Sequence, residues 1–350
     1  MLTGEGHVAK ERLTRAASML LWLALSAYTL TSGRGLLGLS TAWLIYSILS
    51  RFMAVAGAKH FLPELTLLRG RWRKDHARSI AMPSARWALT QLGALLILQT
   101  DNVIIAWTLG PKAIPAYEAA AKVITAMGTI ALLRTNATVP YYSRLWSYAD
   151  LTGMGQLLYA NVDRGLLIMC TAFSFMSFFG RDVFQLWLGP GHFVGYPILL
   201  VLLVTASLET HQIGHATLTM ATGNIPFVRI ALGAGVLNLL LSLLLVRTEG
   251  LLGVALGTLL AQIATNYWYG PYVTLRLIKV SPLRYIKRFT IKVIPTLILF
   301  VGLQAVASKM CQGRSSSLRL VIGVSLSFLI YGIATYARWP SSRMRNVNLA

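Results

Sequence analysis

The chain has 350 residues, of which 55% are hydrophobic and only 12% are charged, and its formal net charge is +21. A mean hydropathy of +0.61 is typical of a membrane protein rather than a soluble one, so the positive charge does not indicate nucleic-acid binding. With only two cysteines, the sequence offers neither a disulfide framework nor a metal cluster.

Apolar segments of about 20 residues follow one another along the chain, and the charged residues lie in the gaps between them. A helix needs roughly 17 to 25 such residues to cross a bilayer, because hydrocarbon offers backbone amides no partner but one another. The sequence therefore predicts an all-α integral membrane protein with about ten transmembrane helices. In chain order the predicted spans are 16–32, 35–57, 87–109, 119–140, 165–180, 194–222, 228–246, 251–275, 290–307 and 318–336.

Positive residues are concentrated on one side of the predicted membrane. If the N-terminus is cytoplasmic, the inner segments hold about 22 of the 32 lysines and arginines, and the outer segments hold about 7. Cytoplasmic loops carry such an excess of positive charge, so both chain termini are predicted to lie in the cytoplasm.

The longest polar interval, 59–86, separates the first two spans from the rest. Phe61, Leu65, Leu68 and Trp72 recur at helical spacing, while arginines and a lysine supply a cationic face. This pattern predicts an amphipathic helix on the inner leaflet, with an ordinary solvated basic loop as the alternative. No segment is long enough for a nucleotide-binding domain or a large catalytic loop.

Ionisable residues inside spans cost several kcal/mol when they face lipid, so they normally face a cavity or a partner. Arg51, in the second span, either contacts a substrate or extends to the headgroups. Asp101 and Lys122 lie at matched depth in two antiparallel spans joined by a tight loop, which predicts an ion pair between them. Such a pair either takes part in coupling or only clamps the hairpin.

The fourth span carries a second cation, Arg134, followed by Asn136 along a partly polar stripe. We expect Lys122 and Arg134 to lie on a similar face and to form a ladder of positive charge, which would suit an anionic substrate such as a diphosphate. The alternative for Arg134 is an anchor whose side chain extends to the cytoplasmic headgroups.

The sixth span contains Glu209, His211 and His215 in an otherwise apolar helix. A buried carboxylate near imidazoles is suited to proton coupling, and hydrogen bonding between helices is the equally weighted alternative. Two histidines without a third ligand do not predict a metal site. The sequence has no nucleophile elbow, Walker loop, HExxH motif or paired carboxylates, which favours a transporter over an enzyme.

Four stretches in one order resemble a known family: QTDNVIIAWTLGPKAIPAYEAAAKV (99–123), FFGRDVFQLWLGPGH (178–192), TLTMATGNIPFVR (217–229) and LNLLLSLLLVRTEGLLGVALGT (237–258). Each is a loose hydrophobic motif, but their order and spacing together are more specific. The region from Trp87 to Lys279 resembles the Wzx-type O-antigen and polysaccharide flippases of the multidrug/oligosaccharidyl-lipid/polysaccharide exporter superfamily.

The resemblance implies a fold of two six-helix lobes around a cavity that opens alternately to either side. It divides the chain into a two-helix remnant of the first lobe (1–58), a linker (59–86), a complete second lobe (87–280) and a C-terminal helix pair with its tail (281–350). About four spans of the first lobe are then missing, so we expect either a truncated start or a second chain that supplies them.

The resemblance also implies the function. We expect translocation of an undecaprenyl-diphosphate-linked oligosaccharide across the bacterial inner membrane in polysaccharide or lipopolysaccharide biosynthesis, with H+ or Na+ coupling and no other cofactor. Lys122, Arg134, Asn136 and Arg51 would contact the substrate. Three alternatives stay open: a drug antiporter of the same superfamily, a membrane-embedded acyltransferase or polymerase, and a non-functional remnant.

Overall fold

The computed structural model describes residues 8–61 and 74–338, and all regular secondary structure within these ranges is helical. The chain divides into two compact units, Met1–Ile80 and Ala81–Ala350. Among the described residues, nine helices are long and apolar enough to cross a membrane, and Ala16–Thr31 is a shorter apolar helix. The prediction of an all-α integral membrane protein is confirmed, and each predicted span lies largely on helical residues.

The first unit contains a helical hairpin of α1 (Val8–Thr31) and α2 (Gly35–Phe61). Gly33 and Gly35 have positive φ angles of 72° and 53° in the turn, a conformation that glycine adopts without strain. The tilted rings of Trp22 and Tyr46 lie 6.3 Å apart across the hairpin. Most of the amphipathic helix predicted on the inner leaflet falls in 62–73, outside the described residues. Residues 74–86, which we expected in the linker, form the first turns of α3.

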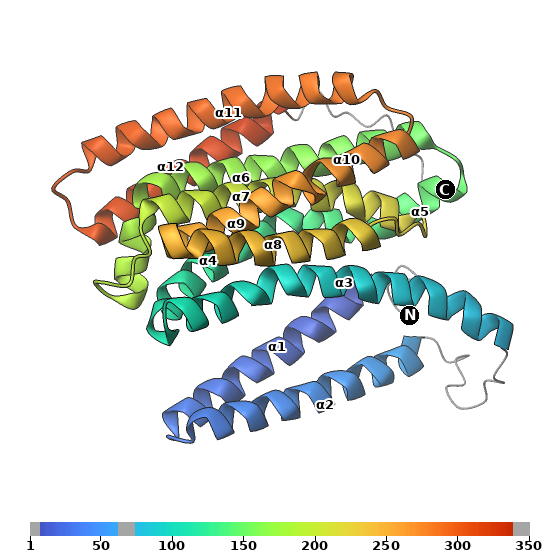
Figure 1. Cartoon of the computed structure of the whole chain (residues 1–350), viewed down its shortest axis with the longest axis horizontal. Helices are drawn as coiled ribbons and strands as arrows, with labels where there is room; N and C mark the ends of the chain where they lie inside the picture. Colours follow the sequence, from blue (N-terminus) through green and yellow to red (C-terminus); the bar gives the residue numbers. More distant parts are fainter. Residues whose placement is uncertain (1–7, 62–73, 339–350) are drawn as a thin grey trace. The chain divides into compact units, whose positions relative to one another are not determined.

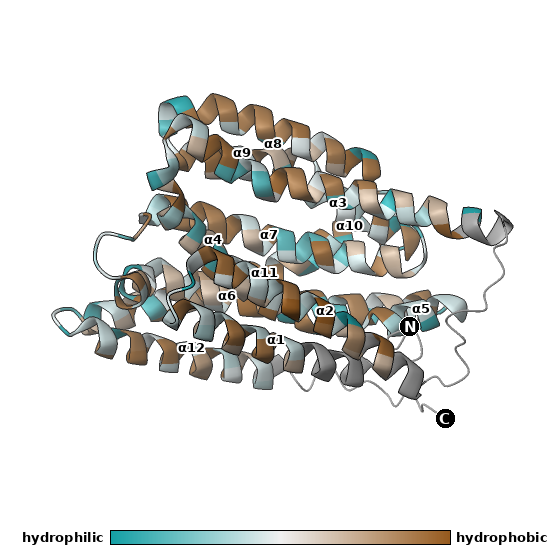
Figure 2. Cartoon of the chain, turned by 90° about the horizontal axis from the view of Figure 1, so that it is seen from below, coloured by the Kyte–Doolittle hydropathy of each residue, from teal (hydrophilic) through white to brown (hydrophobic). Residues whose placement is uncertain are grey.

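The second unit holds the other helices, which run alongside one another (Figure 1). They are α3 (Lys74–Thr108), which begins just before the unit boundary, α4 (Ile114–Ala137), α5 (Val139–Ser147), α6 (Leu151–Leu188), α7 (Tyr196–Ala221), α8 (Val228–Glu249), α9 (Leu251–Ala264), α10 (Asn266–Leu277), α11 (Pro282–Met310) and α12 (Ser316–Arg338), with a single 3-10 turn at Pro111–Ala113. Hydrophobic residues cover most of their length, and α7 contains a hydrophilic stretch (Figure 2).

The helix α6 lies against α4, α7, α11 and α12, and so forms the centre of the second unit. It has 38 residues, or about 57 Å at 1.5 Å per residue, which exceeds the roughly 30 Å of hydrocarbon in a bilayer. The helix begins where Asp150 caps the amide of Gly153 and ends at Gly189, whose φ is 86°. The predicted span 165–180 is therefore only the middle of a longer helix.

Two predicted spans are each built from two helices. The segment 119–140 ends in a break at Thr138, after which Pro140 lies in the first turn of α5. The segment 251–275 breaks at Thr265, whose φ and ψ of −126° and −85° are not helical. Proline is tolerated in the first turn of a helix, because the amide hydrogen that it lacks would have no partner within the helix there.

The hairpin of α8 and α9 is packed through glycine. A Cβ atom on Gly257 would lie 2.6 Å from the backbone nitrogen of Ser242, and one on Gly253 would collide with the carbonyl of Leu245. Small residues allow the backbones of two helices to approach this closely. In membranes, van der Waals packing rather than the hydrophobic effect drives helix association. This close packing holds Ser242 and Thr258 near the residues described next.

Candidate substrate-contact and coupling sites

One face of α4 carries an exposed polar stripe. Its members recur three, four or seven residues apart, which places them on one side of a helix; they are the exposed Lys122, Thr125, Thr129 and Asn136, with the half-buried Glu118 at one end. The stripe runs over about 27 Å, close to the thickness of the hydrocarbon. The exposed Leu133 interrupts the stripe between Thr129 and Asn136. The polar groups on either side of it are costly against lipid, so those parts of the face are suited to water, substrate or protein.

Lys122 belongs to this stripe and its side chain is 75% exposed. Its ammonium lies 3.1 Å from the Glu118 carboxylate, one turn earlier in the same helix. The amide of Asn102 on α3 donates to the other carboxylate oxygen of Glu118. The hairpin of α3 and α4 is thus joined through Asn102 and Glu118, while the ammonium of Lys122 stays exposed to whatever faces α4.

The predicted ion pair between Asp101 and Lys122 is wrong. The Tyr117 hydroxyl donates to Asp101 at 3.0 Å, and the Thr258 hydroxyl lies 3.2 Å from the same carboxylate oxygen. Asp101 is only 9% exposed, whereas Lys122 points away from it along the exposed stripe. Asp101 meets α4 at Tyr117, five residues before Lys122, so similar distances from the ends of two spans do not determine which side chains meet.

Further polar groups from α8 and α9 surround the Asp101 carboxylate. The Asn238 amide donates to the Thr258 hydroxyl at 2.7 Å, and the Ser242 hydroxyl donates to the Val254 carbonyl at 3.3 Å. Within the described ranges no basic side chain is paired with Asp101. Burial of an ionised carboxylate inside a membrane protein costs free energy unless the carboxylate binds a proton or a cation. Among the described residues, Asp101 is therefore the strongest candidate for coupling.

Arg134 does not continue the stripe of Lys122. The two residues are 12 positions apart, which rotates Arg134 by about 120° around the axis. Its Nε donates to the Asn161 side-chain oxygen on α6 at 2.9 Å, and the Asn161 amide donates to Thr138 at 2.7 Å and to Tyr142 at 2.9 Å. The expected ladder of two cations on a similar face is wrong, because Arg134 is held against α6. Asn136 is exposed and does lie on the stripe.

The histidines of α7 connect that helix to α11. His211 Nε2 lies 2.8 Å from the Tyr285 hydroxyl. His215 Nδ1 lies 2.9 Å from the His211 carbonyl, and because a carbonyl only accepts, this nitrogen carries the proton. His215 Nε2 is buried without a hydrogen-bond partner. His211 therefore makes a hydrogen bond between helices, as one interpretation expected, whereas His215 bonds within α7. The proton-coupling interpretation stays a prediction.

The remaining predicted residues take no part in these networks. Glu209 is half-buried on α7 and forms no hydrogen bond or ion pair with residues 8–61 or 74–338. Arg51 is exposed on α2 in the first unit. In the described ranges no three histidine, cysteine or acidic residues gather in a group that could hold a metal ion.

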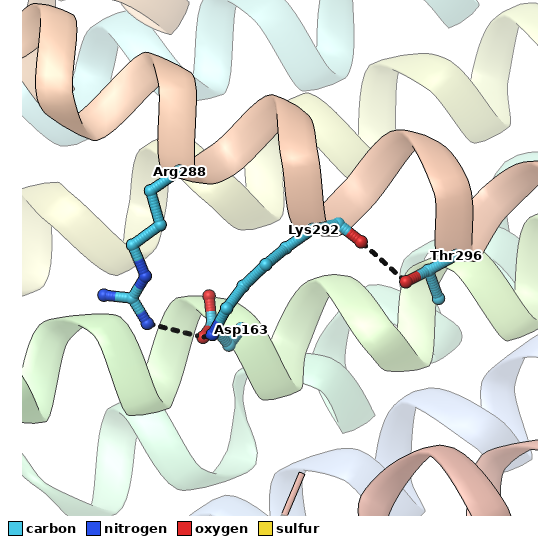
Figure 3. A network of polar contacts seen from close by, with 4 residues as sticks. All are labelled: Asp163, Arg288, Lys292 and Thr296. Carbon is cyan, nitrogen blue, oxygen red and sulfur yellow. Dashed lines mark hydrogen bonds and ion pairs between the residues drawn. The ribbon is translucent and has the colours of Figure 1, made fainter. Parts of the chain in front are cut away.

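Sequence reasoning missed a charged cluster between α6 and α11, which Figure 3 shows. Asp163 of α6 accepts from Arg288 at 2.9 Å and from Lys292 at 2.8 Å. The Arg288 guanidinium also lies 3.8 Å above the ring centre of Tyr159, which stacks on Tyr285 at 5.9 Å. The cluster therefore continues into the pair of Tyr285 with His211.

A sequence signal for this cluster existed. Arg288 and Lys292 are four residues apart on one face of α11, and Tyr285 and Phe289 flank them at helical spacing. The predicted spans began at residues 165 and 290, so Asp163 and Arg288 were assigned to solvated loops. Because α6 and α11 begin earlier, these charges lie between packed helices instead.

A comparison of the chain with models of protein families and with curated protein sequences finds no match. Among solved structures, the chain is similar to lipid II flippase MurJ in its inward closed conformation, with a TM-score of 0.65 and 15% sequence identity. The chain has the fold of that flippase. The similarity covers 94% of this chain and 68% of MurJ. At this identity the likeness establishes the fold, and the expected Wzx-type substrate, inner-membrane location and partner chain stay predictions.

Proposed function

We propose that this chain is a flippase that moves a lipid-linked substrate between the two leaflets of a membrane. The observation that carries the proposal is the likeness of 94% of the chain to lipid II flippase MurJ. The family resemblance described above refines the substrate to an undecaprenyl-diphosphate-linked oligosaccharide, exported across the bacterial inner membrane for O-antigen or another polysaccharide. No described site favours an acyltransferase, a polymerase or a drug antiporter.

The stripe on α4 supports a sugar-bearing substrate. The Asn136 amide, the Thr125 hydroxyl and the Glu118–Lys122 pair supply donors and acceptors over about 27 Å. The Thr129 hydroxyl donates to the Thr125 carbonyl at 2.9 Å, so it offers a substrate an acceptor. Sugar hydroxyls are recognised by such neutral hydrogen-bonding groups, whose bonds exchange readily with water as a substrate moves. We therefore assign the stripe to the oligosaccharide.

The diphosphate is assigned to Arg134. Only its Nε is used toward Asn161, which leaves the two terminal nitrogens of the guanidinium for a phosphate oxygen. Asn161 is itself oriented by Thr138 and Tyr142, so Arg134 is held in one direction before a substrate arrives. Lys122 contributes less positive charge to this step than expected, because Glu118 pairs with it.

Coupling is assigned to Asp101. The Asp101 carboxylate can hold a proton, and together with the Tyr117 and Thr258 hydroxyl oxygens it offers the oxygen ligands that suit a small monovalent cation such as Na+. Glu209, His211 and His215 are the second coupling candidates. Replacement of Asp101 by Asn keeps the shape and removes the charge, so it should uncouple transport from the ion gradient.

The experiment is an export assay in a flippase-deficient bacterial strain, with lipid-linked sugar measured at the outer leaflet and the amount of protein measured by immunoblot. The double variant Thr125→Val and Thr129→Val removes two hydroxyls from the stripe at nearly unchanged volume. We expect reduced export at unchanged protein level. The matched control is Thr248→Val, an exposed threonine at the end of α8 and away from the stripe, which should export normally. Normal export by the double variant would overturn the assignment of the stripe.

A further inference from the structure

An open pocket of about 350 Å³ lies where α6 ends and α7 and α12 begin. All of its lining residues are polar, and they are Arg181, Asp182, Gln185, Tyr196, Ser316 and Arg319. Arg181 is 18 residues along α6 from Asp163, or about 27 Å, so the pocket lies at the other end of the bundle from the Asp163 cluster. The positive-inside prediction places this end at the outer face of the membrane.

Positive charge is in excess around the pocket. Asp182 is 5% exposed, and its carboxylate lies 3.2 Å from the Arg319 guanidinium. That acidic group is therefore neutralised and is not free to attract a cation. Arg181 is exposed and has no carboxylate partner within the described ranges. The Nε of Arg319 is buried and has no acceptor. The lining thus contains two guanidinium groups and one carboxylate.

Helix ends add to the positive potential. The helices α7 and α12, of 26 and 23 residues, begin at Tyr196 and Ser316, which both line the pocket. The start of α7 has no side-chain cap, and Pro197 in its first turn has no amide hydrogen, so the amides of Tyr196 and Ile198 are the ones left without a side-chain acceptor. The N-terminus of a helix carries partial positive charge and binds anions through such amides.

We propose that this pocket binds a phosphate-class anion, namely a phosphodiester or diphosphate group. Guanidinium groups match phosphate oxygens in geometry, and a pocket of this size lies in the range of ligand sites. The Tyr196 hydroxyl donates to the Phe178 carbonyl at 3.3 Å, which fixes that ring as one wall. The site is separate from the α4 stripe and from Arg134, and binding there does not require that the chain transports anything.

Two sources could supply the same chemistry: the headgroup of an anionic lipid in the adjacent leaflet, or the diphosphate of a lipid-linked sugar after translocation. Two probes of the purified full-length protein distinguish them. Inorganic pyrophosphate is titrated calorimetrically in detergent micelles, and retained phosphatidylglycerol is counted by native mass spectrometry after release from nanodiscs. Retention of phosphatidylglycerol assigns the pocket to lipid headgroups, and binding of pyrophosphate without such retention assigns it to the carrier diphosphate.

The deciding variant is Arg181→Gln, which removes an exposed, unpaired charge and leaves the fold intact. It should weaken binding of the probe about tenfold, the effect of one charge-assisted hydrogen bond. Arg247→Gln, an exposed arginine at the end of α8 and outside the pocket, is the matched control and should bind normally. Asp182→Asn releases Arg319 from its pair and should tighten binding. The proposal is overturned if neither probe binds, if Arg181→Gln binds as the wild type does, or if Arg247→Gln weakens binding equally.

Discussion

The cluster that joins α6 to α11 makes a quantitative prediction about Asp163→Asn. One carboxylate serves both Arg288 and Lys292, and the side chains of Asp163, Arg288 and Lys292 are 27%, 34% and 38% exposed. Exposed ion pairs contribute about 0 to 1 kcal/mol, whereas loss of one partner from a buried pair costs about 3 to 5 kcal/mol. The two half-buried contacts lie between these limits, so the substitution should cost about 2 kcal/mol in total.

The measurement is the melting temperature of the purified protein, taken from the fraction that stays monodisperse on size-exclusion chromatography after heating. We expect Asp163→Asn to lower it by about 5 °C. Addition of Lys292→Met should recover part of that loss, because it removes one of two like charges left four residues apart on α11. Glu249→Gln, an exposed acidic residue at the end of α8, is the control and should leave the temperature unchanged.

Two results would refute this reasoning. The first is a melting temperature for Asp163→Asn equal to that of the wild type, which would mean that the contacts contribute nothing to stability. The second is strict additivity of Asp163→Asn and Lys292→Met, because residues that interact show a coupling energy in a double-mutant cycle.

Three further predictions concern packing and topology. Asp101→Asn and Lys122→Met should have additive effects on stability, because the two side chains do not meet, and a coupling above about 0.5 kcal/mol in a double-mutant cycle would contradict the structure. Gly257→Ala should reduce the yield of folded protein, because its methyl group would displace α8 from α9, whereas Gly233→Ala meets no atom within 4 Å and should be tolerated. In a cysteine-free background, Gln312→Cys in the exposed turn between α11 and α12 should react with an impermeant maleimide on intact spheroplasts, and protection until lysis would reverse the predicted orientation.

The choice of Gln312 for the topology experiment follows from a feature that sequence position does not reveal. Cys311 lies in the same turn and is 3% exposed, so a failure to label the natural cysteine would not distinguish burial from the wrong side of the membrane. Position in a loop indicates the side of the membrane, because the chain must cross the bilayer between loops. It does not indicate exposure, because a turn packs against neighbours from elsewhere in the chain.

Local properties of the sequence were sufficient for the helices. A span in hydrocarbon must satisfy its own backbone, so about 20 apolar residues specify a helix without reference to any other segment. The contact of Lys122 with Glu118 could also have been predicted from the sequence, since a glutamate four residues before a lysine on a helix commonly forms an ion pair with it. The ends of α6 were predicted less well, because a helix that continues beyond the bilayer loses its apolar signal before it loses its helical structure.

The partners of the buried polar groups were decided by the tertiary structure alone. Asp101 meets Thr258, which is 157 residues away, and Asp163 meets Arg288, which is 125 residues away. Hydropathy gives the depth of each residue, but it leaves open the rotation of each helix and the identity of its neighbours. Helix rotation and neighbours are set by close packing. The glycines of α9, for example, let α8 pack against its backbone, which places Asn238 within hydrogen-bond distance of Thr258. The sequence by itself therefore determined which residues cross the membrane, and only the packed helices decided which charges meet within it.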